Sequence, residues 1–218
     1  MPTEGTAAGF DTTADKEELA KRAAADPAVL EQVFDALLGS KRRARQQASR
    51  VVHAVAIHDP VALKPWGDAL ADALEVPESQ TRWEILGTLE KLVAVDARII
   101  DKALPGITTA LHDAESGVVR LAAFRVLCAY GATTATRSER IWPLVDEGLR
   151  VFHGDPEFPA MLVGVVRLIT GNASDAVKRA AAERMEFDAE HSKGLVARRA
   201  RQIVDCAPKK RAKKAKSD

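Results

Sequence analysis

One pair of side chains has the types and the spacing to act on a bound molecule. Trp142 and Asp146 lie four residues apart, so on a helix they share a face and place a carboxylate beside an aromatic ring. Such a pair can stabilise a cationic group, for example a charged base turned out of a duplex. The alternative is that Trp142 packs in the core or at the rim of an amphipathic helix, as most tryptophans do.

The other reactive residue types lack partners at the spacing that catalysis or metal binding requires. His53 and His58 are five residues apart, which does not bring them to one helical face. Cys128 and Cys206 are far apart and have no other ligand type at metal-binding spacing. The sequence contains no Gly-x-Ser-x-Gly motif and no glycine-rich phosphate loop. We therefore expect no metal, no cofactor and no enzyme activity.

Arginine is the residue type whose distribution favours binding. Basic residues concentrate in the segments 41–57, 116–131 and 193–206, whereas the helical segments that alternate with them are acidic in sum. A basic surface attracts an acidic protein segment or a phosphate backbone. The candidate binding residues are Arg42, Arg45, Arg50, Arg82, Arg120, Arg125, Arg167, Arg198 and Arg201. The structural alternative is that such arginines pair with a nearby acid, as Arg120 could with Asp113.

A repeating pattern of amphipathic helices must position these arginines. Apolar residues recur at helical spacing, and nothing alternates with a period of two. Similar segments begin at residues 41, 79, 116, 157 and 193, a period of roughly 40 residues that indicates an alpha solenoid of two helices per repeat. One position of the repeat should be buried throughout, and it is occupied by Ala48, Ile85, Ala123, Val165 and Ala200.

The first helix of each repeat carries its own signals. These helices are expected over 28–38, 60–74, 97–111, 137–152 and 175–189. Asp26 and Asp59, each followed by proline, are predicted N-caps of the first two. Proline also lies inside three of these helices, where it should bend the helix or delay its start, at positions 65, 105 and 143.

The stretch from Leu104 to Gly131 resembles a HEAT repeat. It has a Leu-Pro opening at 104–105, Asp113 after the first helix, then Val119-Arg120 and Ala122-Ala123 in the second. The resemblance covers about residues 28 to 206 and implies an all-α fold, a right-handed armadillo-like superhelix of about five helical hairpins plus an N-terminal helix. In such solenoids the second helices line the concave face, so the resemblance implies a basic inner surface.

The two ends of the chain differ from this repeat domain, which we place at residues 15–206. Residues 1–14 are polar, and 207–218 form a basic segment without an apolar core, so both are expected to be disordered. The basic residues of the second segment that could attach weakly to a polyanion include Lys209, Lys210, Arg211, Lys213 and Lys214. No basic-then-apolar leader and no apolar stretch of membrane-spanning length occurs, so we expect a cytoplasmic protein.

The sequence therefore predicts a non-enzymatic scaffold that binds a macromolecular partner, in particular a protein with an acidic surface. Nucleic-acid binding by the same arginines is the alternative, and it predicts an affinity that falls steeply with salt. A third hypothesis is an enzyme. The pair Trp142 and Asp146 resembles the aromatic and carboxylate used by DNA glycosylases for alkylated purines, which are HEAT-like, and this resemblance would imply base excision. Partner identity and oligomeric state are left open by the sequence.

Overall fold

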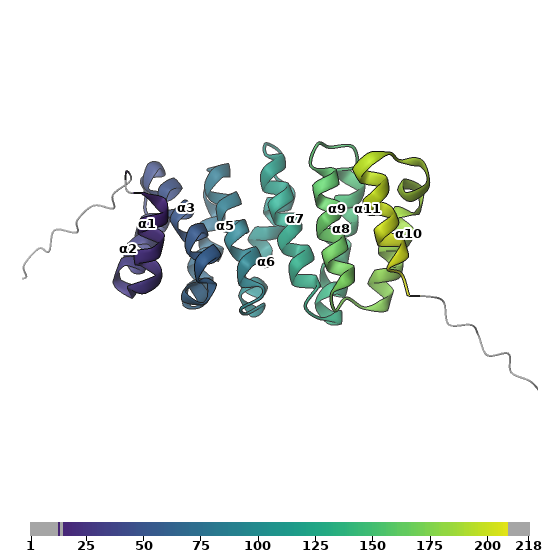
Figure 1. Cartoon of the computed structure of the whole chain (residues 1–218). Helices are drawn as coiled ribbons and strands as arrows, with labels where there is room; N and C mark the ends of the chain where they lie inside the picture. The colour runs from purple at the N-terminus through teal and green to yellow at the C-terminus, as the bar shows by residue number, and fades with distance from the viewer. Residues whose placement is uncertain (1–12, 14, 209–218) are drawn as a thin grey trace, which may run out of the picture. The chain divides into compact units, whose positions relative to one another are not determined.

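The computed structural model describes Thr13 and residues 15–208, and all regular structure in that part of the chain is helical (Figure 1). Residues 1–12, 14 and 209–218 lie outside the described residues, and with them most of the two segments expected to be disordered. An N-terminal helix, α1 (Lys16–Ala25), precedes five helical pairs. The number of hairpins and the period predicted from the sequence are confirmed.

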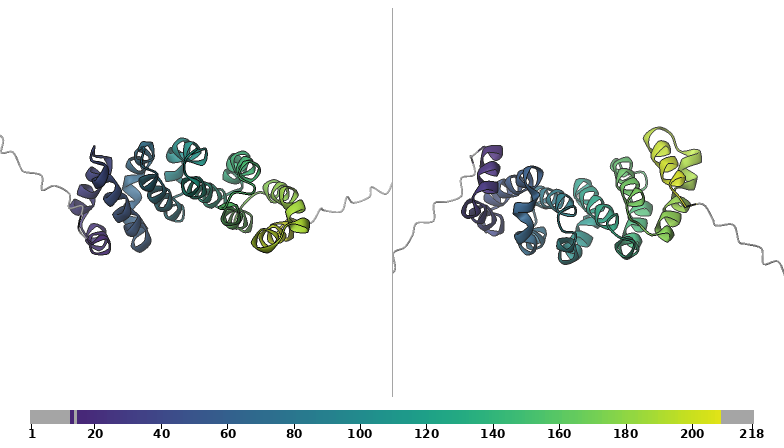
Figure 2. Two further views of the ribbon diagram at one scale, coloured as in Figure 1. Left: turned by 90° about the horizontal axis from the view of Figure 1, so that it is seen from above. Right: turned by 60° about the horizontal axis from the view of Figure 1, so that its bottom comes forward.

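The helices match the predicted segments closely. The first helices of the pairs are α2 (Pro27–Leu38); η1 (Pro60–Trp66), α4 (Gly67–Asp72) and η2 (Ala73–Glu75), which together form one segment; α6 (Arg98–Leu111); α8 (Ala135–Val151); and α10 (Asp175–His191). The second helices are α3 (Arg42–His58), α5 (Ser79–Leu92), α7 (Gly117–Gly131), α9 (Phe158–Thr170) and α11 (Gly194–Asp205). Further views show the helices of each part lying side by side (Figure 2).

The chain divides into two compact units. Unit 1 is Met1–Val126 and unit 2 is Leu127–Asp218, so the division falls within α7. In unit 1, α1 and α2 pack on α3, α3 packs on α5, and α4 packs on α6. In unit 2, α8 contacts α10, and α11 packs on α9 and α10. In both units second helices therefore neighbour second helices, as expected for a solenoid.

Local sequence accounts for where several helices begin. The Asp26 carboxylate accepts a hydrogen bond from the Ala28 backbone N–H at 2.9 Å, which makes Asp26 the N-cap of α2 as predicted. Asp59 caps η1 in the same way, but Pro65 lies inside this 3-10 segment and the α-helix begins only at Gly67. The predicted delay is confirmed there, whereas Pro105 and Pro143 lie within α6 and α8.

The core consists mainly of small and branched aliphatic side chains from facing helices. The repeat position predicted to be buried is fully buried in every repeat, from Ala48 in α3 to Ala200 in α11. Aromatic packing is rarer, as the low aromatic content requires, and Phe34 stacks on Trp66 with 4.1 Å between ring centroids. None of the helices over the described residues is both long and apolar enough to cross a bilayer.

Candidate functional site

A ladder of buried ion pairs connects successive repeats of unit 1. The Arg45 guanidinium on α3 binds both carboxylate oxygens of Glu78, the N-cap residue of α5. One repeat further on, Arg82 on α5 forms an ion pair with Asp113, which precedes α7. These four side chains are at most 16 % exposed. We call the two pairs the arginine ladder.

The ladder carboxylates are held in their charged form. The hydrogen bond from Arg45 lowers the pKa of Glu78 despite the burial of this side chain. Burial alone would raise the pKa of Asp113, but hydrogen bonds from the backbone N–H groups of Glu115 and Ser116 and from Arg82 outweigh it, so this pKa is also lowered. Both pairs therefore fix the contact between adjacent repeats in a charged, hydrogen-bonded state.

Arg120 occupies the same repeat position, but its contact with Asp113 is not the ion pair that the structural alternative offered. Its Nη1 donates instead to the Asp113 backbone carbonyl oxygen at 2.9 Å, as Arg45 Nη1 donates to the Gly39 carbonyl at 3.0 Å. The Asp113 carboxylate faces Arg82 of the preceding repeat because that helix lies beside the loop. Sequence reasoning missed Glu78, although an acid just before a second helix in two successive repeats was a readable signal.

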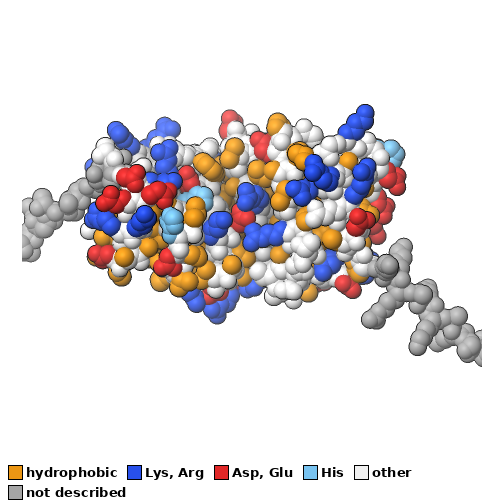
Figure 3. Space-filling view, in the orientation of Figure 1, with side chains coloured by type: hydrophobic (Ala, Val, Ile, Leu, Met, Phe, Trp, Pro, Cys, Tyr) orange, Lys and Arg blue, Asp and Glu red, His pale blue; other side chains and the backbone are white. Residues whose placement is uncertain are grey.

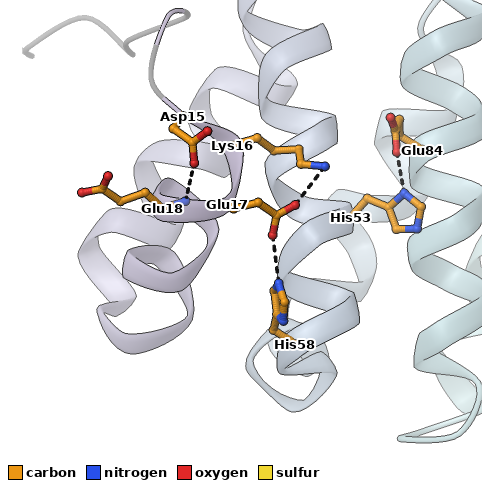
Figure 4. A network of polar contacts seen from close by, with 7 residues as sticks. All are labelled: Asp15, Lys16, Glu17, Glu18, His53, His58 and Glu84. Carbon is orange, nitrogen blue, oxygen red and sulfur yellow. Dashed lines mark hydrogen bonds and ion pairs between the residues drawn. The ribbon is translucent and has the colours of Figure 1, made fainter.

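A second row of contacts joins the second helices of unit 1 through partly buried side chains. The Gln80 side-chain oxygen, when its amide is oriented toward α3, accepts a hydrogen bond of 2.9 Å from Arg50. His53 Nδ1 contacts the carboxylate of Glu84 on α5 (Figure 4), and Arg125 on α7 lies 3.1 Å from the Glu90 carboxylate. These contacts join α3 to α5 and α5 to α7 within unit 1.

The N-cap and the first turn of α3 carry three consecutive cations that form no ion pair with a described residue, although Arg42 acts electrostatically on Glu78. Lys41, Arg42 and Arg43 are exposed and form no hydrogen bond or ion pair with another described residue. The first turn of α3 contains no acid, and its N-cap has no side-chain hydrogen bond. Basic side chains lie among hydrophobic ones over the face shown in Figure 3. Trp83 on α5 is 37 % exposed and adds an aromatic surface to the second helices.

The candidate arginines of unit 2 are more scattered. Arg167 on α9 and Arg198 on α11 are exposed. Arg201 Nε donates to the Ala189 backbone carbonyl at 2.9 Å, so Arg201 closes the hairpin of α10 and α11. The candidate residues of the C-terminal segment, Lys209, Lys210, Arg211, Lys213 and Lys214, lie outside the described residues.

Trp142 and Asp146 lie on one face of α8, as their spacing predicts. With Ala180, Glu183 and Arg184 of α10 they line a shallow pocket in unit 2. Arg184 binds both oxygens of Asp146, at 2.7 and 3.1 Å, and Arg150 lies 3.5 Å from the same carboxylate. The carboxylate is thus already neutralised by protein cations.

The described histidines join helices and cap helix ends. His58 Nε2 lies 2.9 Å from Glu17 of α1, next to the N-cap Asp15 (Figure 4), and this hydrogen bond lowers the pKa of Glu17. In unit 2, His153 Nε2 lies 3.1 Å from the buried Asp188, which also accepts a hydrogen bond from Ser192 at 2.6 Å. Ser192 donates to the acid and not to the imidazole, so this trio does not activate a nucleophile. No group of His, Cys, Asp or Glu among residues 15–208 is placed to hold a metal ion.

Comparison with known proteins identifies the fold. No protein-family model and no curated protein sequence matches the chain. A designed armadillo-repeat protein is similar over 88 % of this chain and 92 % of its own, with 12 % sequence identity and a TM-score of 0.68. Another, in complex with the peptide (KR)4, gives 13 % identity, coverage of 88 % and 91 %, and a TM-score of 0.67. A computationally designed armadillo-repeat protein for modular peptide recognition gives 14 % identity, coverage of 88 % and 92 %, and a TM-score of 0.64. With five helical hairpins over its described residues, the chain therefore has the fold of the armadillo-like and HEAT-like alpha solenoids.

Proposed function

We propose that this protein is a non-enzymatic scaffold that binds an acidic segment of a protein partner on the exposed side of its second helices. The observation that carries the proposal is the cluster Lys41, Arg42 and Arg43 at the start of α3. Cations at a helix N-terminus oppose the helix dipole and cost stability. Three consecutive cations that form no ion pair with a described acid would be stabilised by a bound anion.

The partner's charge follows from the same residues. Similar solved structures include an armadillo-repeat protein that binds the peptide (KR)4. A peptide of that kind would be repelled by Lys41, Arg42 and Arg43, whereas glutamate or aspartate side chains would pair with them. The exposed Trp83 offers an apolar contact on the next second helix, so a segment that mixes acidic and apolar residues fits this surface best.

A nucleic acid would use the same cations, and we keep it as the second candidate function. Phosphate binding would show the steep salt dependence of counterion release. A base-excising enzyme would need the Asp146 carboxylate, and we do not propose that activity because Arg184 and Arg150 already engage it.

The test compares two double variants of the full chain. Arg42→Glu/Arg43→Glu removes the cluster on α3, and Lys21→Glu/Arg22→Glu makes the same charge change on exposed positions of α1. Binding to a fluorescent poly-glutamate peptide and to single-stranded RNA is measured at two salt concentrations. The proposal expects peptide binding that only the first variant abolishes. Loss of peptide binding in both variants, or binding to RNA alone, would contradict it.

A further inference from the structure

The exposed face of α10 carries an aromatic ring and several acidic side chains, and it is separate from the proposed binding surface on the second helices. Phe187 is 69 % exposed and is the most exposed of the large hydrophobic side chains over the described residues. Glu183, Glu186 and Glu190 surround it at helical spacing, and all three are exposed. We call these four residues the Phe187 face.

The glutamates of the Phe187 face lack neutralising partners. None of them forms an ion pair or a hydrogen bond with another residue of the described chain. Arg184, their neighbour on α10, is committed to Asp146 through two hydrogen bonds. Arg150 on α8 lies near the same Asp146 carboxylate, and Arg179, one turn before Glu183, is a further exposed cation. The three glutamates outnumber Arg179, so the Phe187 face keeps a net negative charge.

The pocket beside α8 continues this face. Glu183 belongs to the Phe187 face and also lines the pocket with Trp142 and Ala180. Glu183 therefore connects the Trp142 pocket to the rest of the Phe187 face, where the Phe187 ring stacks on His191 with 4.5 Å between ring centroids. Such a surface suits Lys and Arg side chains, because ammonium and guanidinium groups gain from aromatic faces as well as from carboxylates.

We propose that the Phe187 face and its pocket bind the chain's own basic C-terminal segment, residues 209–218. This segment has six basic residues and one acid, a charge that complements the three unpaired glutamates. The proposal is independent of partner binding by the second helices. Its consequence is that the basic residues of the segment are held against α10 and kept away from other polyanions.

The position of the last described residues makes this contact reachable. Only Ser192 and Lys193 separate α10 from α11, and the two helices pack on each other, so they run antiparallel. The end of α11 therefore lies beside the first half of α10, where Ala180 and Glu183 are located. Ten extended residues span ~33 Å, which exceeds the ~25 Å length of a 17-residue helix such as α10.

The experiment uses the full chain with a nitroxide near its C-terminus. Ser217→Cys carries the label, Cys206→Ser removes the partly exposed native thiol, and Cys128 is buried. The readout is the broadening of the three tryptophan indole N–H signals in the 15N-labelled protein. Trp142 lines the proposed site, whereas Trp66 and Trp83 belong to unit 1 and serve as internal references.

At about 0.01 M salt, where the Debye length is ~30 Å, the Trp142 signal should fall about twofold or more relative to the other two. About 1 M salt should restore it. Glu183→Gln/Glu186→Gln/Glu190→Gln should restore it as well, whereas the matched triple Glu31→Gln/Asp35→Asn/Glu75→Gln, on exposed positions of unit 1, should not.

Three outcomes would overturn the proposal. Equal broadening of all three tryptophan signals would show that the segment has no preferred binding site. Broadening that is strongest at Trp83 would show that it binds unit 1 instead. A mixture of 15N-labelled protein without nitroxide and unlabelled protein with nitroxide tests the intramolecular contact. If the mixture reproduces the broadening of Trp142, the segment binds a second copy and the proposal for one chain is wrong.

Discussion

Arginines of two kinds lie on the second helices of unit 1, and they differ in what surrounds them. Arg45 and Arg82 are mostly buried and reach a carboxylate of the next repeat. Arg42 and Arg43, one turn or less before Arg45, are exposed and form no ion pair with a described acid. Helical phase therefore decides the role of an arginine here. Arginines on one side of these helices bind the next repeat, and those on the other side are exposed to solvent.

The largest expected effect on stability comes from the buried arginines. Arg82→Met should destabilise the protein by about 3 kcal/mol, because it leaves the buried Asp113 carboxylate without its cation. Urea unfolding measures the change. The double variant Arg82→Met/Asp113→Asn should lose less than the sum of the two single variants, since the isolated charge is gone. If Arg42→Met lowered the free energy of unfolding as much as Arg82→Met, the two kinds of arginine would not differ in their contribution to stability.

Acid should weaken the ladder from pH 4.5 downward. The pKa values of Glu78 and Asp113 lie below their ordinary values of 4.5 and 3.8, so the folded protein binds fewer protons than the unfolded chain. Their contribution is therefore complete above those values and is lost as the pH falls through the lower, folded-state pKa values. Between pH 7 and pH 3, the free energy of unfolding measured in urea should fall less for Glu78→Gln than for the wild type. The control Glu31→Gln, at an exposed site, should lose as much as the wild type.

The contact between His53 and Glu84 is intermediate in burial between the arginine ladder and the exposed arginines, and it tests whether partly buried contacts also hold the repeats together. A Cβ added to Gly87 on α5 would meet the His53 ring at 2.9 Å and displace it from Glu84. Gly87→Ala should therefore show no net gain in stability, although alanine is worth about 1 kcal/mol more than glycine in a helix. In a His53→Ala background the same substitution should stabilise by about 1 kcal/mol in thermal or urea unfolding. An equal effect in both backgrounds would show that the ring does not require the glycine.

The smallest expected effect on stability belongs to the exposed arginines. Arg42→Glu/Arg43→Glu should change the free energy of unfolding by less than about 0.5 kcal/mol, or raise it slightly, because acids at a helix N-terminus favour the dipole. The same variant should lose affinity for an acidic peptide. Destabilisation comparable to that of Arg82→Met would mean that the cluster has a structural role, and would remove the main support for the proposed binding surface.

Helix positions and the repeat were readable from the sequence for local reasons. Asp-Pro pairs cap helices wherever they occur, because the aspartate oxygen satisfies a free N–H and proline fits the first turn. Apolar spacing alone placed Ala48 and Ala200 in the core, since a helix buries one stripe of its surface. The armadillo-like fold follows from repeating that pattern five times.

The candidate site was less predictable, because partners far apart in sequence define it. Arg120 and Arg82 are equivalent by spacing, yet only the structure shows that Asp113 gives its carboxylate to Arg82 and its carbonyl to Arg120. The sequence predicted that Asp146 could act on a ligand beside Trp142, but in the structure its carboxylate binds Arg184 of the next repeat.

The sequence by itself determined the helices, their caps, their period and the residues that face the core, because these depend on interactions within a few residues along the chain. Only the tertiary structure decided which arginines are consumed in contacts between repeats, which cations of α3 are left unpaired, and that Phe187 stands exposed among free glutamates. Those outcomes depend on which side of one helix meets its neighbour, and a charge there is neutralised or left free according to the distance to a residue some 35 positions away.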